Sequence, residues 1–250
     1  MALVDSPGTV IVPTSDIGRY MAFWVCLNRL QQPAGTQVAI TQGSNISSNL
    51  NGALRSMKGD WVQIWGDDHT FSPGLLLNLL RRLDEHPEAG ILLPLCLRRR
   101  GSFHTPLGVE WWQGDSGEME ILPLALVPDP ATGLFEISQA GLPGAVIRRE
   151  VLEAVGDPWF EWNTIYDLTR GVGKIQLRMG EDFYFCRKVK EKGFKIFVDL
   201  AQTIGHIISP TTVPRWSPAQ KRWVIDIVLD GVTISTVAPT VKLIEERNTP

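Results

Sequence analysis

Short apolar runs alternate with amphipathic stretches along the first hundred residues of the chain. The apolar runs are rich in Val, Ile and aromatic residues, which is typical of buried strands, and they cover residues 8–13, 37–41, 61–65 and 91–95. Between them, apolar side chains recur at helical spacing over residues 16–30, 46–57 and 74–86. Ser72 and Pro73 are typical of the N-cap and the first residue of the last of these helices. The alternation predicts an α/β fold with a doubly wound, mostly parallel sheet and helices on both faces.

The second half of the chain has a less regular pattern. Residues 101–136 are rich in Gly, Pro, Trp and acidic residues, and they predict hairpins and loops over the sheet. Residues 139–147 then lead into a helix over residues 148–155. A further helix over residues 181–192, with Gly193 as its C-cap, precedes a strand over residues 195–200.

The end of the chain predicts an extension of the main domain. A segment rich in Pro, Ser and Thr follows residue 206, and two apolar runs come after it, at residues 222–229 and 232–237. We therefore expect residues 1–207 to form the main domain and residues 208–250 to form a C-terminal extension that packs on the same domain.

The composition is that of an ordinary globular protein. Lys and Arg number 24 against 27 Asp and Glu, so no basic excess favours a nucleic-acid partner. No run approaches the roughly 18 apolar residues of a membrane span, and the N-terminus does not predict a signal peptide. The three cysteines are an odd number without metal-ligand spacing, which predicts buried, reduced thiols in the cytoplasm: Cys26, Cys96 and Cys186.

Two adjacent carboxylates follow the strand predicted over residues 61–65. Gly66 allows a sharp turn there, which places Asp67 and Asp68 at the carboxyl end of the strand. Ligands of open α/β sheets bind at this edge. The paired carboxylates repel each other unless a cation neutralises them, and a hard divalent ion shared with a substrate's phosphates would do so. The alternative is a solvated turn without a ligand.

Four separated stretches resemble, in order and spacing, the family 2 glycosyltransferases, which transfer sugar from a nucleotide sugar. The stretches are TVIVPT (9–14), WGDDHTF (65–71), GLPGAVIRREVLEAVGDPWFE (141–161) and MGEDFYFCRKVKEKGFKIFVDLAQTIGH (179–206). The resemblance implies a GT-A-like fold in which residues 1–207 form a nucleotide-sugar-binding catalytic domain with acceptor-side loops. It further implies transfer from a nucleoside-diphosphate sugar to the hydroxyl of a carbohydrate or other acceptor, with inversion at the anomeric carbon.

The resemblance also implies a metal site. Asp68 takes the place of the last Asp of the family's Asp-x-Asp region, and His206 resembles the histidine that completes the site around Mn2+ or Mg2+. Gly66 stands where the family has its first Asp, so that either Asp67 substitutes for it or the ribose contact is lost. On its own, a His that follows a strand is more often a hydrogen-bonded structural residue than a metal ligand.

Asp182 matches the family's catalytic base, and Glu181 is its neighbour. An acceptor hydroxyl loses its proton as it attacks the anomeric carbon, and a positioned carboxylate can accept that proton. The alternative for both residues is an acidic pair that interacts favourably with the dipole of the helix it begins.

The remaining candidates are nucleotide and sugar contacts that the resemblance implies. Nucleotide contacts are expected from Pro13, Thr14, Gln42, Asn49 and Asp67. Donor or acceptor contacts are expected from Gly141, Gly144, Trp159 and Trp162. The other three histidines are expected at the surface: His69, His86 and His104.

Two other classes of protein fit parts of the pattern. A sugar nucleotidyltransferase would need a Gly-rich phosphate loop with a basic residue directly after the first strand, and PTSDIGRYM (13–21) is a poor match. A catalytically silent module that binds carbohydrate or nucleotide is the second alternative, and the Gly at position 66 favours it.

Overall fold

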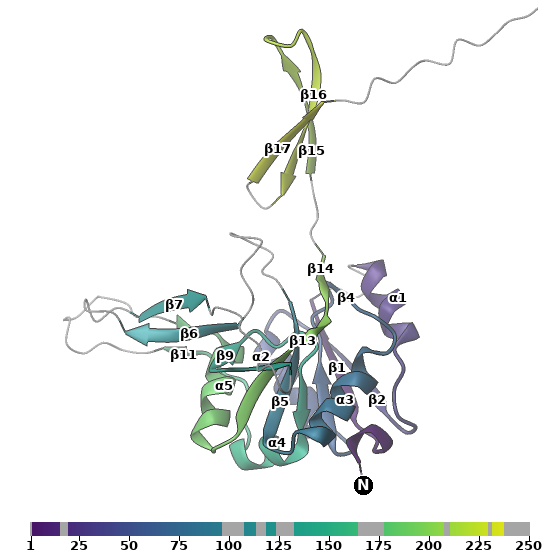
Figure 1. The fold of residues 1–250 in the computed structure, drawn as a ribbon, viewed down its shortest axis with the longest axis vertical. Helices are drawn as coiled ribbons and strands as arrows, with labels where there is room; N and C mark the ends of the chain where they lie inside the picture. The colour runs from purple at the N-terminus through teal and green to yellow at the C-terminus, as the bar shows by residue number, and fades with distance from the viewer. Residues whose placement is uncertain are drawn as a thin grey trace, which may run out of the picture. The chain divides into compact units, whose positions relative to one another are not determined.

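The computed structural model describes residues 2–15, 20–96, 108–113, 119–123, 133–164, 178–207, 211–229 and 232–237 of the 250-residue chain. The chain divides into two compact units (Figure 1). The first comprises Met1–Arg98 and Ser102–Ile207, and the second comprises Arg99–Gly101 and Ile208–Pro250. Packing of the extension on the main domain stays a prediction.

A seven-stranded sheet forms the centre of the first unit. Its order is β2 (Gln37–Gln42), β1 (Thr9–Thr14), β3 (Trp61–Ile64), β10 (Val146–Arg148), β5 (Ala89–Leu95), β13 (Lys195–Thr203) and β8 (Leu134–Ile137). Five strands run parallel, while β10 and β8 run antiparallel to their neighbours. The predicted α/β, mostly parallel fold is confirmed. Residues 139–147 lead into a helix as predicted, but the strand β10, which begins at Val146 and lies in the middle of the sheet, was not predicted.

Helices cover both faces of the sheet because its buried strands alternate the direction of their side chains. In β1, Val10 and Val12 belong to one core cluster and Ile11 to the other. The first cluster includes side chains of α1 (Met21–Arg29) and α3 (Leu75–Glu85), together with Leu3 of a short 3-10 helix, η1 (Leu3–Asp5). The second includes side chains of α2 (Ile46–Arg55), α4 (Arg149–Val155) and α5 (Glu181–Glu191).

Two predicted helix ends are corrected. Gly74, not Ser72, is the N-cap of α3, because the backbone carbonyl of Ser72 accepts the N–H of Leu75 in a turn that precedes the helix. Lys192, not Gly193, is the C-cap of α5, and Gly193 follows it with a φ of +85°. None of the described helices combines the length and apolar character that a membrane crossing requires.

Smaller sheets complete both units. A hairpin of β6 (Gly108–Gln113) and β7 (Met119–Pro123) lies in the segment predicted to contain hairpins, and β6 also pairs with β9 (Gln139–Ala140). β11 (Asn163–Thr164) pairs with β12 (Arg178–Met179). In the second unit, β15 (Thr211–Ser217), β16 (Arg222–Leu229) and β17 (Val232–Val237) form an antiparallel sheet. β15 lies in the Pro/Ser/Thr-rich segment, where the β-branched Thr and Val residues suit a strand.

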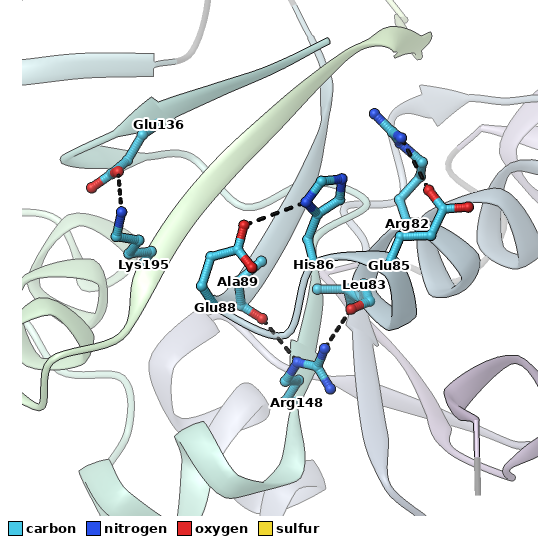
Figure 2. Close-up of polar contacts among 9 residues, drawn as sticks. All are labelled: Arg82, Leu83, Glu85, His86, Glu88, Ala89, Glu136, Arg148 and Lys195. Atoms are coloured by element: carbon cyan, nitrogen blue, oxygen red, sulfur yellow. Dashed lines mark hydrogen bonds and ion pairs between the residues drawn. The ribbon is translucent and has the colours of Figure 1, made fainter. Parts of the chain in front are cut away.

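Arg148 links several elements at the edge where the parallel strands begin (Figure 2). Its Nε donates to the backbone carbonyl of Ala89 at 2.8 Å, and its second guanidinium nitrogen donates to the carbonyl of Leu83. Nearby, His86 Nδ1 lies 3.3 Å from Glu88 Oε1, and Lys195 lies 3.1 Å from Glu136. Because the last carbonyls of a helix lack partners within it, Arg148 stabilises the end of α3 against the start of β5.

Candidate active site

A two-stranded ribbon brings two histidines together at the opposite edge, where the parallel strands end. β4 (His69–Thr70) pairs antiparallel with β14 (Gly205–His206), with His206 opposite His69. The imidazole rings stack with their centroids 4.5 Å apart and their planes 24° apart. A Cβ at Gly205 would lie 2.5 Å from Thr70 Oγ1, so a larger residue there would force the Thr70 side chain to shift.

Cys96 reaches the same ribbon from the end of β5. The register of β13 against β5 shifts near the end of β13. Asp199 pairs with Pro94, and Thr203 pairs with the next residue of β5, Leu95. Cys96 therefore follows β5 directly beside the start of β14. One ring nitrogen of each histidine and the Sγ of Cys96 lie within 4.8 Å of one another. His69 and Cys96 are buried, with 4% and 3% of their surface exposed, and His206 is partly exposed.

Asp68 contacts both imidazoles. Its Oδ1 lies 3.0 Å from His69 Nδ1, and its Oδ2 lies 3.4 Å from His206 Nε2. The His69 Nδ1 also lies 3.2 Å from the backbone carbonyl of Gly66. A Cβ at Gly66 would come 3.0 Å from Asp68 Oδ1 and 3.2 Å from His69 Cε1. The glycine thus leaves space for these two side chains, which is a physical reason for the departure from Asp-x-Asp.

The four side chains strongly shift one another's protonation. Burial by itself would raise the pKa of the Asp68 carboxyl, but hydrogen bonds and charge from His206 and His69 hold this pKa far below its ordinary value. Burial disfavours the charged form of His69, yet Asp68 and Cys96 raise the pKa of its imidazole to about 9. Burial also favours the neutral thiol of Cys96, but His206 and His69 lower its pKa. The ionised carboxylate of Asp68 therefore lies beside a protonated His69 imidazole, and a divalent cation could replace an imidazole proton.

The donor set fits a divalent metal. Imidazole, thiolate and carboxylate are the protein groups that bind zinc and related transition metals. The Nε2 atom of His69 is buried and makes no hydrogen bond within the part of the chain that the structure describes. A buried imidazole nitrogen of this kind is suited to metal coordination, because burial of an unbonded polar atom otherwise costs free energy.

The nucleotide candidates lie at the ends of β1, β2 and β3 and on α2. Thr14 Oγ1 donates to Asp67 Oδ2 at 2.7 Å, and both side chains are buried. Pro13 precedes Thr14 at the end of β1. Gln42 is exposed at the end of β2, and Asn49 donates its side-chain N–H to the carbonyl of the neighbouring Gly43 at 3.0 Å. All five candidates therefore lie at the carboxyl edge, and Asp67 joins the ends of β3 and β1.

Glu181 and Asp182 form the first turn of α5. The backbone N–H of Phe183 donates to Asp182 Oδ1 at 2.8 Å. Burial, followed by the charge of Glu181, raises the pKa of Asp182 to about 7, and burial raises the pKa of Glu181. Because α5 leads into β13, which runs parallel to β5, its first turn lies at the carboxyl edge of the sheet. The structure thus places Asp182 at the same edge as the histidine cluster.

The four expected sugar contacts differ in accessibility. Gly144 has a φ of +74° and packs against Pro94 and Trp65, and its N–H donates to the carbonyl of Ile64 at 2.7 Å. Gly141 is partly exposed just after β9. Trp159 is partly buried and donates its indole N–H to a carbonyl of α4, whereas Trp162 has 56% of its surface exposed.

Two members of the cluster were not predicted as site residues. The expectation that His69 lies at the surface is wrong, and Cys96 lacked any ligand spacing in the sequence because the cluster comes from three separate strand ends. The usable signals were the place of His69 within the acidic turn and of Cys96 directly after a predicted strand. His86 is partly buried, and His104 lies outside the described residues. None of the three cysteines forms a disulfide.

Comparisons with known proteins identify a family from the sequence and a fold from the structure. The family model described as Glycosyl transferase family 2 matches residues 31–156. A crystal structure of GalNAc-T7 with UDP, GalNAc and Mn2+ aligns with a TM-score of 0.54 at 12% identity, over 81% of this chain and 43% of that one. This chain therefore spans less than half the length of GalNAc-T7, and the likeness shows a shared GT-A fold.

Two further solved structures align more loosely. A197 from STIV aligns with a TM-score of 0.49 at 13% identity, over 93% of this chain and 98% of that one. TarS 1-349 from S. aureus aligns with a TM-score of 0.46 at 15% identity, over 80% of this chain and 60% of that one. No curated protein matches the sequence.

Proposed function

This chain belongs to glycosyl transferase family 2, and from this premise we propose that it transfers a sugar from a nucleoside-diphosphate sugar to an acceptor hydroxyl with the help of a divalent cation. The observation that carries the proposal is the meeting of Asp68 with His69, Cys96 and His206 at the carboxyl edge of the sheet. Ligands of open α/β sheets bind at this edge. A cation held by these side chains would face the phosphates of a bound nucleotide.

The group around Asp68 and His206 would hold the cation, for which the family resemblance favours Mn2+ or Mg2+. When bound, such a cation acts as a Lewis acid that neutralises the charge developing on the leaving diphosphate. Support comes from the GalNAc-T7 structure, which has the same fold and contains Mn2+ together with UDP.

Asp182 would act as the general base. Its carboxylate accepts the proton of the acceptor hydroxyl while the hydroxyl oxygen forms a bond to the anomeric carbon. The bond from that carbon to the diphosphate breaks on the opposite side, so the configuration inverts. A pKa of about 7 supports this role, because a base of this strength is still substantially ionised at neutral pH and is a better proton acceptor than an ordinary carboxylate. Glu181 would assist by raising that pKa through its charge.

The other candidate residues would position the substrates. The ends of β1 and β2 and the turn at Asp67 would contact the nucleotide, through Pro13, Thr14, Gln42, Asn49 and Asp67. The partly exposed Gly141 would let the donor sugar approach the backbone, and the buried Gly144, which packs against Pro94 and Trp65, would support that turn. The exposed face of Trp162 offers a stacking surface for an acceptor sugar, and Trp159 supports the same segment.

A screen of nucleotide sugars tests the proposal directly. The purified chain is incubated with each donor and a cation, and release of free nucleoside diphosphate is measured. Release from at least one donor, abolished by Asp182→Asn, is the expected result. If no donor is consumed and calorimetry detects no binding of any nucleoside diphosphate with Mn2+, the proposed function is wrong.

A silent nucleotide-binding module is the second candidate, and the glycine at position 66 is the observation that favours it. The module would bind a nucleoside diphosphate in calorimetry with Mn2+ and release none from any nucleotide sugar. The screen and the calorimetry together therefore separate the two candidates.

A further inference from the structure

We infer that Cys96 is a metal ligand, and that His69, Cys96 and His206 together form a site for a thiophilic divalent cation such as Zn2+. Asp68 orients the two imidazoles. The inference rests on the proposed function only in placing this cation where a nucleotide's diphosphate would lie. It changes the expected ion, since the family resemblance favours Mn2+ or Mg2+.

The positions of the three ligand groups carry the inference. Their donor atoms lie within 4.8 Å of one another, although they come from β4, β14 and the residue after β5. His69 and Cys96 form the buried side of the group, at 4% and 3% exposure. Apolar neighbours would be sufficient for a thiol that is buried only by packing, whereas Cys96 lies beside two imidazoles.

The hydrogen bonds of His69 leave one ring nitrogen for a metal. Its Nδ1 lies 3.0 Å from Asp68 Oδ1 and 3.2 Å from the carbonyl of Gly66. Its Nε2 is buried and, across the residues that the structure describes, bonds to no oxygen or nitrogen atom, while Cys96 interacts with the same ring. Metal-binding histidines usually donate their second ring N–H to a carboxylate or a backbone carbonyl, which fixes the tautomer. Asp68 and Gly66 provide both kinds of acceptor.

One side of the group is partly open to solvent. The side chains of His206 and Asp68 are 17% and 16% exposed, whereas that of His69 is 5% exposed. Three protein ligands with a fourth position open to solvent is the arrangement of catalytic zinc sites. A diphosphate oxygen could occupy that fourth position from the exposed side.

The sulfur determines which ions bind well. Thiolate ligands favour Zn2+ and Co2+ over Mg2+ and Mn2+, which prefer oxygen. We therefore expect the intact chain to bind Zn2+ and Co2+ more tightly than Mn2+. Loss of a residue that only supports a metal ligand typically weakens metal binding by about 10–100-fold. Replacement of Cys96 by Ser removes a ligand itself, so Zn2+ binding should weaken by at least about tenfold.

Cobalt spectroscopy tests the inference without relying on activity. The metal-free chain is titrated with Co2+, and the near-ultraviolet band of charge transfer from thiolate to cobalt is recorded. The band is expected in the intact chain and in the control variant Cys26→Ser, whose thiol lies on α1, and it should vanish in Cys96→Ser. A double variant, Cys26→Ser with Cys186→Ala, keeps Cys96 as its only thiol and should retain the band, so the test holds even where Cys96→Ser fails to fold.

Two outcomes would overturn the inference: absence of the band from the intact chain, or its persistence in folded Cys96→Ser. The failure of the proposed function is a separate result, because it is measured by nucleoside diphosphate binding and release. A chain with a band that depends on Cys96 but no nucleotide binding would keep the metal site and lose the transferase. A chain that turns over nucleotide sugar with Mn2+ but shows no band would keep the transferase function and lose the proposed thiolate metal site.

Discussion

The two edges of the central sheet both place a histidine next to a carboxylate, yet they differ in what surrounds the pair. Where the strands begin, His86 lies 3.3 Å from Glu88, and the Glu88 side chain is 48% exposed (Figure 2). Where the strands end, His69 lies 3.0 Å from Asp68, and a second imidazole and a thiol lie within 4.8 Å of its ring. A histidine beside a single carboxylate is therefore poor evidence for a metal site. A second imidazole and a buried thiol beside such a pair are better evidence.

The charged groups at the two edges also have different kinds of partner. Arg148 donates to the carbonyls of Ala89 and Leu83, and these hydrogen bonds join α3 to β5. The side chains of Asp68, His69 and His206 contact one another. We infer that one edge stabilises the fold and that the other binds ligands, and the following changes test that division.

The largest expected effect is on catalysis. Asp182→Asn removes the proposed base with little change in shape, so kcat should fall by about 10²–10⁴-fold while nucleotide-sugar binding stays nearly intact. Steady-state kinetics and calorimetry measure the two quantities. Glu191→Gln, at the exposed other end of α5, is the matched control and should retain full activity. Full activity in Asp182→Asn would exclude this residue as the base.

The carboxylates beside the two histidines should differ in effect. Asp68→Asn should weaken metal-dependent nucleotide binding by about 10–100-fold, because Asn offers one acceptor oxygen where Asp68 offers one to each of the two imidazoles. Glu88→Gln changes the carboxylate beside His86 and should leave binding unchanged. Calorimetry with and without a chelator provides the comparison. Equal effects of both substitutions would contradict the division between the edges.

The pH dependence of transfer should follow the Asp182 carboxyl. Its pKa is raised from 3.8 to about 7 by burial and by the charge of Glu181, so kcat/KM should drop about tenfold per unit as pH falls below about 7. Glu181→Gln removes the charge that helps to raise the pKa of Asp182, so the decline of kcat/KM should begin at a lower pH. An unchanged decline in that variant would mean that another group titrates.

The same pKa has a consequence for stability. Between about pH 4 and pH 7 the folded chain keeps a proton on Asp182 that the unfolded chain has lost, so this group makes the free energy of unfolding decrease as pH rises. The decrease should level off above about pH 7. Denaturant titrations of the intact chain and of Asp182→Asn, compared across this range, should show that the variant lacks this contribution.

Loss of Arg148 should affect stability and spare the site. Arg148→Met keeps much of the apolar stem but removes a charged donor from the carbonyls of Leu83 and Ala89, and loss of these two hydrogen bonds should cost about 1–3 kcal/mol. Urea unfolding measures the loss, and cation binding by the folded variant should equal that of the intact chain. Weakened cation binding would show that the two edges are coupled.

The smallest expected effect comes from Gly66→Ala. The added methyl group would lie 3.0 Å from Asp68 Oδ1, so these side chains must shift and cation affinity should fall by about threefold to tenfold, or about 1 kcal/mol. Gly52→Ala on α2 is the control, since its methyl group meets nothing within 4 Å and should stabilise the helix by about 0.5–1 kcal/mol. Unchanged affinity in Gly66→Ala would remove the packing explanation for this glycine.

The sequence predicted what depends on long periodic segments. Apolar runs and helical spacing identified the parallel strands and the helices, and the order of motifs identified Asp68 and His206, which the structure brings within 3.4 Å. Periodicity could not predict β10, which has three residues, or the pairing of β4 with β14, which have two residues each. His69 and Cys96 were therefore not predicted as site residues. Their approach depends on strand pairing between residues more than a hundred positions apart in the sequence.

The irregular end of β13 has a consequence for how the chain tolerates change. Asp199 pairs with Pro94 and Thr203 pairs with Leu95, so residues 200–202 have no counterpart on the neighbouring strand. Side chains alternate along an extended chain, and therefore one inserted or deleted residue here would turn the imidazole of His206 toward the other side of the ribbon. Relatives that keep this chemistry should conserve the number of residues between Asp199 and Thr203.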